Sequence, residues 1–190
     1  MAAKPGERKL QILQVIAEML QTPSGEKITT AALAKRLDVS EAALYRHFAS
    51  KAQMFEGLIE FIESGLFSVI NKIASEEEDG LLQAQMIVSL LLGFAEKNRG
   101  LTRVLIGDAL VNENERLQTR INQLLDRVEA SLKQALRVAA TQGKLSTTHD
   151  FAAHANLLRC YAIGRWHQFV KSGFKDAPLA QWPQQWPLLA

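Results

Sequence analysis

The sequence predicts an all-α protein with a three-helix unit at the N-terminus and a larger helical bundle behind it. Apolar residues recur three or four positions apart along most of the chain, the period of an amphipathic helix. No segment alternates apolar and polar residues as a half-buried strand does. Near the N-terminus, two short capped segments flank a tight turn, as in a helix-turn-helix. We therefore expect a helix-turn-helix domain at residues 1–50 and a helical core domain at residues 51–190.

The first predicted helix covers residues 7–21, where apolar side chains recur at helical spacing. The turn residues Thr22-Pro23-Ser24-Gly25 end it. At its start, Lys4, Arg8 and Lys9 form a basic arm. Such an arm either lies along a phosphate strand or remains in solvent, and the sequence leaves both interpretations open.

The next two helices form the helix-turn-helix. Thr29 and Thr30 precede the second helix, residues 31–37, and suit both helix capping and the binding of phosphate oxygens. Asp38-Val39 is a tight turn, and the third helix is expected at residues 39–48. In this geometry the first of the pair crosses a nucleic-acid backbone and the second enters the major groove.

The third helix has one anchoring face and one face suited to reading DNA. Ser40 is a preferred N-cap, and Leu44 and Phe48 lie four residues apart on the buried side. Small residues on the other side allow a close approach to the groove floor, and Arg46 can bind a guanine edge or a phosphate. This outward face is formed by Ala42, Ala43, Tyr45 and Arg46. We interpret the segment as a recognition helix, although an ordinary surface helix has a similar composition.

A long fourth helix is expected to follow directly. Ser50 and Gln53 have the spacing of a capping box, in which each side chain satisfies a backbone donor near the helix start. An apolar stripe continues to about residue 74. Lys51 lies in the first turn, where the helix dipole disfavours a cation, so a nearby phosphate is one explanation for it.

The rest of the chain is predicted to form further helices at residues 81–96, 101–111, 115–142 and 149–171, before a tail that contains Pro and Trp. Gly143 fits the position that follows a helix end. The last two long helices are amphipathic, and pairing them with a second copy would form a four-helix bundle. Such a homodimer would hold two recognition helices roughly 34–36 Å apart and would read a palindrome. A monomeric core is the alternative.

Composition and motifs limit the function classes. Residues 1–56 carry eight Lys/Arg against six Asp/Glu, and residues 57–190 carry fourteen of each, so the small basic excess lies near the helix-turn-helix. We find no phosphate-binding glycine loop, paired-cysteine motif or nucleophile elbow, and His149 and His154 are poorly spaced for shared ligation on one helix. We therefore expect neither an enzyme nor a cofactor or metal.

The predicted location is the cytoplasm. Cys160 is the only cysteine, which suits a reducing compartment, and the first ten residues lack the apolar segment of a secretory signal. The most apolar run, residues 86–95, is far shorter than the roughly 20 residues of a membrane-spanning helix. No interaction with a membrane is expected.

The stretch ITTAALAKRLDVSEAALYRHFASKAQMFEGLIEFIE resembles the DNA-binding domain of the TetR family, in which Tyr-x-His-Phe and Ser-Lys follow the helix-turn-helix. The similarity covers residues 7–60. It implies a double-stranded palindromic DNA partner, with Ser40, Ala42, Ala43 and Arg46 at the base edges. The residues that it implies for phosphate binding are Thr29, Thr30, Tyr45, His47 and Lys51.

The C-terminal part resembles TetR-family members that act in nucleoid occlusion, through LLLGFAEKNRGLTRVLIGDAL and ERLQTRINQLLDRVEASLKQALR. The resemblance implies a nucleoid-associated protein that binds many chromosomal palindromes, with one or two dimers per site, and captures the C-terminal tail of the division protein FtsZ. The residues matched to the tail site are Phe61, Leu90, Gly93, Lys97 and Asn98. At Lys97 and Val69 the chain departs from the expected arginine and basic residue, which would weaken contact with an acidic tail.

A repressor controlled by a small molecule is the alternative function within the same family. In that case the bundle would enclose a ligand pocket, and ligand binding would lower DNA affinity. Cys160, Tyr161, Trp166 and His167 are candidates for lining such a pocket.

Overall fold

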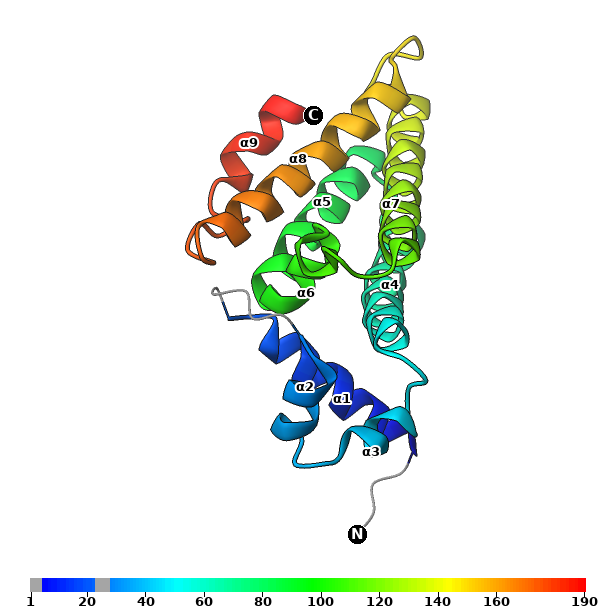
Figure 1. Ribbon diagram of the computed structural model, residues 1–190. Helices are drawn as coiled ribbons and strands as arrows, with labels where there is room; N and C mark the ends of the chain where they lie inside the picture. The colour runs from blue at the N-terminus through cyan, green and yellow to red at the C-terminus, as the bar shows by residue number, and fades with distance from the viewer. Residues whose placement is uncertain (1–4, 23–27) are drawn as a thin grey trace.

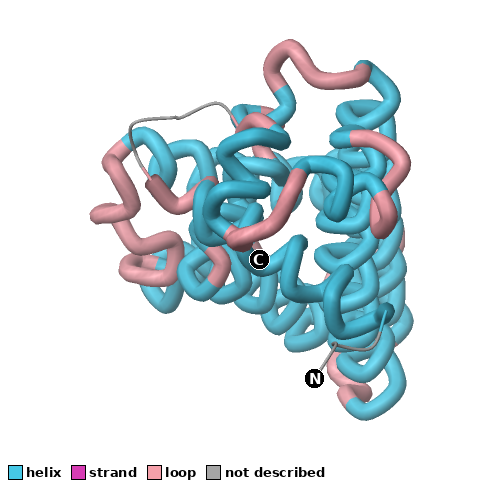
Figure 2. The backbone as a smooth tube through the Cα atoms, turned by 60° about the horizontal axis from the view of Figure 1, so that its bottom comes forward, coloured by secondary structure: helices cyan, strands magenta, loops and turns pink. Residues whose placement is uncertain are grey.

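A computed structural model describes residues 5–22 and 28–190, and these residues fold entirely into helices and loops, without a strand (Figures 1 and 2). The predicted all-α fold is therefore confirmed. Lys4 of the predicted basic arm and Pro23, Ser24 and Gly25 of the predicted turn lie outside the described residues. The helices in chain order are α1 (Pro5–Met19), α2 (Thr30–Arg36), α3 (Glu41–Tyr45), α4 (Lys51–Glu76), α5 (Gly80–Lys97), α6 (Arg99–Leu105), the 3₁₀ helix η1 (Asp108–Leu110), α7 (Glu115–Thr141), α8 (Phe151–Lys171) and α9 (Trp182–Leu189).

The caps predicted in the N-terminal unit are present. The Thr29 hydroxyl accepts a hydrogen bond from the Ala32 N–H at 3.1 Å, and the Ser40 hydroxyl accepts one from the Ala43 N–H at 3.2 Å. Helices α1, α2 and α3 pack together through residues that are at most 1% exposed, including Leu33 and Leu44. We call α1, α2 and α3 the head, and the helices from α5 onward the body. Each short helix of the head has both a cap and a buried leucine, so the head can be ordered although α2 and α3 are short.

Helix α4 connects the head to the body (Figure 1). At its start the Ser50 hydroxyl accepts from the Gln53 N–H at 3.2 Å, and Gln53 Oε1 accepts from the Ala49 N–H at 2.8 Å. The capping box is thus confirmed, although Gln53 reaches the N–H of the residue before the cap. Helix α4 then continues without interruption for 26 residues.

The body is built around α5, which packs against α4, α7 and α8. The Trp166 side chain is completely buried, and its indole N–H donates to the Leu91 carbonyl at 3.0 Å, tying α8 to α5. At the end of α7, Gly143 has φ +74°. Its N–H donates to the Ala140 carbonyl, and the N–H of the next residue, Lys144, donates to the Ala139 carbonyl. This Schellman motif confirms Gly143 as the residue after the helix end.

Two predicted helix lengths are wrong. The helix expected at residues 101–111 ends at Leu105, because Gly107 adopts φ +78° and the chain enters the 3₁₀ turn η1. The helix expected at residues 39–48 is shortened to Glu41–Tyr45, and Arg46 becomes its C-cap.

The Trp-containing tail forms α9, which packs along α8. The Trp182 ring is 5% exposed and lies 5.6 Å from the Tyr161 ring. The Leu189 carbonyl accepts from His154 Nε2 at 2.6 Å, so Nδ1 of a neutral His154 accepts from His149 Nε2 at 2.9 Å. Burial lowers the pKa of His154 from its ordinary value.

The head is docked on the body mainly through α1 and α6. A Cβ atom on Gly100 would lie 2.0 Å from the Ala17 carbonyl oxygen, so the two helix backbones are as close as a glycine allows. Arg103 is 12% exposed in its side chain and donates from Nε to Asp108 at 2.6 Å and from a terminal nitrogen to the Leu20 carbonyl at 3.2 Å. These contacts fix the C-terminal end of α1 against the body.

Candidate nucleic-acid interface and partner groove

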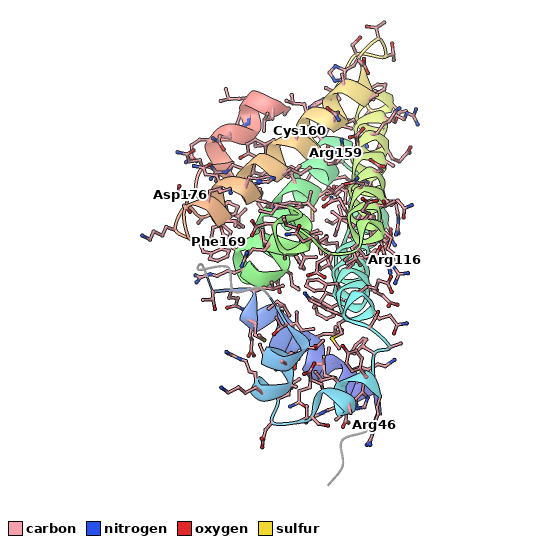
Figure 3. All side chains as sticks on the ribbon, in the orientation of Figure 1. Arg46, Arg116, Arg159, Cys160, Phe169 and Asp176 are labelled. Atoms are coloured by element: carbon pink, nitrogen blue, oxygen red, sulfur yellow. The ribbon has the colours of Figure 1, made fainter. Side chains whose placement is uncertain are left out.

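Helix α3 presents the face that the sequence predicts for DNA reading. Leu44 and Phe48 are buried, whereas Ala42, Tyr45 and Arg46 are exposed. Figure 3 shows Arg46 at the end of the molecule farthest from α9. Because anchoring and outward residues separate on this short helix, its free face can enter a groove without unfolding the head.

The remaining residues assigned to DNA lie on α2 and on the chain that leaves α3. Thr29 is exposed, and Thr30 is half-buried with its hydroxyl donating to Glu41 Oε2 at 2.6 Å. His47 is half-buried in the turn after α3. The Thr30–Glu41 contact ties α2 to α3, so this hydroxyl already has an acidic partner in the free protein.

Lys51 also has an acidic partner. Its ammonium group pairs with Glu113, in the loop before α7, and lies 5.6 Å from the centroid of the Phe55 ring. The two charged side chains are only 22% and 13% exposed. The sequence did not reveal this contact, because the partners are 62 positions apart. The pair offers an explanation for a lysine in the first turn of α4 that does not require a phosphate.

A second surface lies along α4 and α5. On α4, Phe61 and Val69 are 50% and 40% exposed. On α5, Leu90, Gly93 and Lys97 follow one another at helical spacing; Leu90 and Gly93 are half-buried, with Leu90 packed against the core, and Lys97 is exposed. The predicted partner residues therefore occupy one row on each of two adjacent antiparallel helices.

The two rows meet at a groove of about 440 Å³ between head and body. Phe61, Lys97 and Asn98 line it, which brings together three of the five residues assigned to the tail site. Leu90 and Gly93 lie outside this groove, farther along α5, where a Cβ on Gly93 would lie 3.5 Å from the Leu179 side chain. The other lining residues are Leu10, Leu13, Gln14, Ala17, Glu18, Gln21, Leu58, Gly100 and Leu101.

Several members of this surface were missed by the sequence reasoning. Leu82 and Met86 are each 38% exposed and extend the α5 row, and Leu10 adds a 44% exposed apolar side chain from α1. Gly65 lies between Phe61 and Val69 on α4, and no atom outside the neighbouring helix backbone lies within 4 Å of the Cβ it lacks. A mid-helix glycine without a packing reason was the available signal.

The four residues considered for a small-molecule pocket do not face a common space. Cys160 and His167 are exposed, and Trp166 belongs to the core. The Tyr161 hydroxyl donates to Gln185 of α9, and burial raises its pKa. This set therefore has roles in packing and on the surface, and it does not outline a ligand cavity.

Residues 5–22 and 28–190, which the structure describes, contain no cluster of three or more His, Cys, Asp or Glu side chains that could hold a metal ion. No helix within the same residues combines the length and apolar character needed to cross a bilayer.

Comparison with known families gives two matches. Residues 12–58 match the family model described as bacterial regulatory proteins, tetR family. Residues 78–190 match the model of the tetracyclin repressor-like C-terminal domain, of the SlmA-like type. Together these matches include the head from residue 12 onward, the start of α4 to residue 58, and the whole region from α5 to α9.

Solved structures agree with this fold. The chain superimposes on the transcriptional regulator FadR from Bacillus subtilis with a TM-score of 0.75 at 17% identity, covering 95% of this chain and 96% of that one. It superimposes equally well on PfmR, a TetR family regulator from Thermus thermophilus, with a TM-score of 0.75 at 21% identity and coverage of 94% and 96%. At such low identity these similarities establish the fold.

Curated relatives are much closer in sequence. The nucleoid occlusion factor SlmA of Alteromonas mediterranea is 53% identical over 97% of this chain and 95% of its own length. SlmA of Marinomonas sp. is 51% identical over 100% and 96%, and SlmA of Shewanella pealeana is 53% identical over 98% and 95%. By full-length identity, family models and fold, the chain belongs to the TetR family and, within it, to the SlmA nucleoid occlusion factors.

Proposed function

We propose that this protein reads palindromic DNA sites scattered over the chromosome and, when bound there, captures the C-terminal tail of FtsZ and prevents septation over the nucleoid. The observation that carries the proposal is the full-length identity of about half to proteins named nucleoid occlusion factors. The proposed location is the cytoplasm, on the nucleoid. Residues 1–50 would read DNA, and residues 51–190 would bind the partner and the second subunit.

The proposed DNA contacts combine base reading with phosphate binding. The net charge of +2 gives little non-specific attraction to DNA, so specificity has to come from the geometry of α3. Arg46 would reach a base edge or a phosphate, and Ser40, Ala42 and Ala43 would lie close to the groove floor. Thr29, Thr30, Tyr45, His47 and Lys51 would hold the backbone on either side and set the register of the helix.

The groove chemistry supports a short acidic and apolar peptide as the second partner. Phe61 and Leu10 offer exposed apolar surface, and Lys97 adds a cation at the same groove. Gly93 costs about 1 kcal/mol relative to alanine inside a helix. The fold has space for a methyl group there, since the nearest atom would be 3.5 Å away. Packing within the chain therefore does not require a glycine here, although the neighbouring side chain is Leu179 of the same chain.

A homodimer completes the proposal. The apolar face of α7 is used within the chain, because Leu117, Ile121 and Leu124 are at most 1% exposed. Helix α8 instead keeps a free row of small and apolar side chains, which allows close helix packing. This row comprises Ala153, Leu157, Cys160 and Gly164, with Leu157 51% exposed. We propose that α8 contributes the apolar part of the pairing and α7 the polar rim, with one or two dimers on each DNA site.

A chromosome-wide map of bound sites tests the main proposal. Many palindromic sites spread over the chromosome, and sparse near the terminus of replication, are expected for nucleoid occlusion. One or two promoter sites next to the protein's own gene would instead identify a repressor and overturn the proposal. A variant with Arg46→Ala serves as the negative control, since it retains the fold but lacks the proposed base contact.

A peptide-binding measurement tests the partner half. Phe61→Ala should weaken binding of the FtsZ C-terminal tail peptide to the DNA-bound protein and leave DNA affinity unchanged, because Phe61 lies on α4 away from the recognition helix. Leu188→Ala is the matched control, since it truncates an 82% exposed apolar side chain on α9 outside the groove. Equal peptide affinity in the two variants would exclude Phe61 from the site.

A further inference from the structure

Lys51 and Glu113 connect the proposed DNA-binding surface to the loop that leads into α7. We propose that Glu113 competes with a DNA phosphate for Lys51, so that DNA binding requires transfer of the lysine and frees the loop before α7. The proposal rests on the phosphate contact assigned above to Lys51. It adds a residue from the body, remote in sequence from the helix-turn-helix, that sets DNA affinity.

The geometry makes the contact a defined state of the free protein. Glu113 and Lys51 form an ion pair in which both side chains are largely shielded from solvent. The Phe55 ring lies 5.6 Å from the same ammonium group and limits where the lysine can point. A second ion pair, between Arg116 and Glu56 at 2.9 Å, joins the first turn of α7 to α4 nearby. The loop is thus held against α4 on both sides of its entry into α7.

The loop has its own restraints, which the ion pair completes. Glu113 N–H donates to the Leu110 carbonyl at 2.9 Å, and the Asn114 side chain caps α7 by accepting from the Arg116 N–H. Between Leu110 and Glu113, Asn112 has φ +65°, a conformation that asparagine tolerates better than most residues. The carboxylate of Glu113 is therefore positioned by a fixed backbone and does not depend on a chance surface encounter.

The carboxylate and a DNA phosphate compete for Lys51, because the two anions repel each other beside one ammonium group. An ammonium group is a point charge, and a phosphate approaching α4 offers it the same kind of oxygen ligand that Glu113 supplies. If Lys51 turns to the phosphate, Glu113 loses its cation while only 13% exposed. If Lys51 stays with Glu113, the phosphate meets a neutralised lysine beside a carboxylate. Either way the carboxylate lowers the affinity for DNA.

Thr30 repeats the pattern on the head itself. Its hydroxyl, also assigned to a phosphate, donates to the Glu41 carboxylate in the free protein. Two of the proposed phosphate ligands thus begin with a carboxylate partner. Of these two contacts, only the Lys51 pair reaches outside the head, so it is the one that links DNA binding to the loop before α7.

The test uses the full-length protein and a duplex selected from a random-sequence library by the wild-type chain. Glu113→Gln should tighten binding of this duplex about three- to tenfold, because Lys51 is then free at the start. Glu115→Gln, two residues along and exposed, is the control for a general loss of negative charge. Lys51→Gln should weaken binding and reduce the dependence of log affinity on log salt by about one unit.

A double-mutant cycle decides between transfer of the lysine and a general charge effect. In the Lys51→Gln background, adding Glu113→Gln should no longer change the affinity. An equal gain in both backgrounds, or the same gain from Glu115→Gln, would overturn the competition. Wild-type affinity in Lys51→Gln would overturn it while leaving DNA binding intact. Failure of the wild-type chain to select any duplex would instead reject the proposed DNA function, and the competition with it.

Discussion

Gly100 gives the sharpest prediction about how the head is held on the body. Replacing it with alanine places a methyl carbon 2.0 Å from the Ala17 carbonyl oxygen, whereas such contacts ordinarily begin at about 3.3 Å. The obstacle is backbone, so a side-chain rotation cannot remove it. Helices α1 and α6 must separate by about 1 Å, which forfeits a quarter to a half of the dispersion energy of the affected contacts.

The expected cost of Gly100→Ala is about 1–3 kcal/mol, the usual range for overpacking, after an offset below about 1 kcal/mol from the better helix propensity of alanine. Thermal unfolding at fixed protomer concentration should show a midpoint lowered by about 2–9 °C. Gly65→Ala is the matched control. It lies inside α4 with no obstructing atom within 4 Å, so the same substitution should leave the midpoint unchanged or raise it. A Gly100→Ala midpoint at or above that of the wild type would refute the close α1–α6 contact.

Three further outcomes are expected. Arg46→Ala should abolish selective binding of a palindromic duplex in a mobility-shift assay. Sedimentation of this variant should be unaltered, which would show that the subunits still pair. Loss of pairing would contradict the assignment of Arg46 to the outward face of α3. Trp166→Phe removes the donor to the Leu91 carbonyl and should lower the free energy of unfolding in urea by about 1–3 kcal/mol. Because the folded-state pKa of His154 is lowered, the folded chain binds fewer protons than the unfolded chain below about pH 6.5, so stability should fall on acidification through that window. His154→Gln should reduce that fall in midpoints recorded between about pH 5 and 8, whereas the exposed His167→Gln should keep it.

The local features of the fold could be predicted from sequence because their physical causes are local. Ser40, Ser50 and Gly143 each act on backbone groups within about one helical turn. The same holds for the periodicity that separates Leu44 from Arg46, so the buried and outward faces of α3 could be assigned before its length was known. A hydrophobic stripe likewise identified α4, α5, α7 and α8 to within a few residues of their ends.

The features that could not be predicted depend on contacts between distant segments. Lys51 and Glu113 are separated by 62 positions, and nothing near either residue indicates the other. The early end of α6 reflects the left-handed backbone at Gly107 together with the ion pair between Arg103 and Asp108, which spans the turn.

Helix α9 had a readable local signal. Trp182 and Trp186 lie one helical turn apart, and Pro183 suits a first turn, where a proline loses no helical hydrogen bond. The spacing alone did not show which surface the tryptophans cover. That became clear only from the contacts of Trp182 with Tyr161 and of the Leu189 carbonyl with His154.

The unbroken length of α4 has a mechanical consequence. At 1.5 Å per residue its 26 residues form a rod about 39 Å long, so a tilt of about 5° displaces one end by roughly 3 Å relative to the other. In the proposed dimer, two such rods would set the spacing of the recognition helices, and half-sites lie at fixed intervals along the duplex. A peptide bound near the middle of α4 would therefore restrict the tilt of this helix. The tilt of α4 would then influence both the affinity for the peptide and the range of half-site spacings that the dimer can bind.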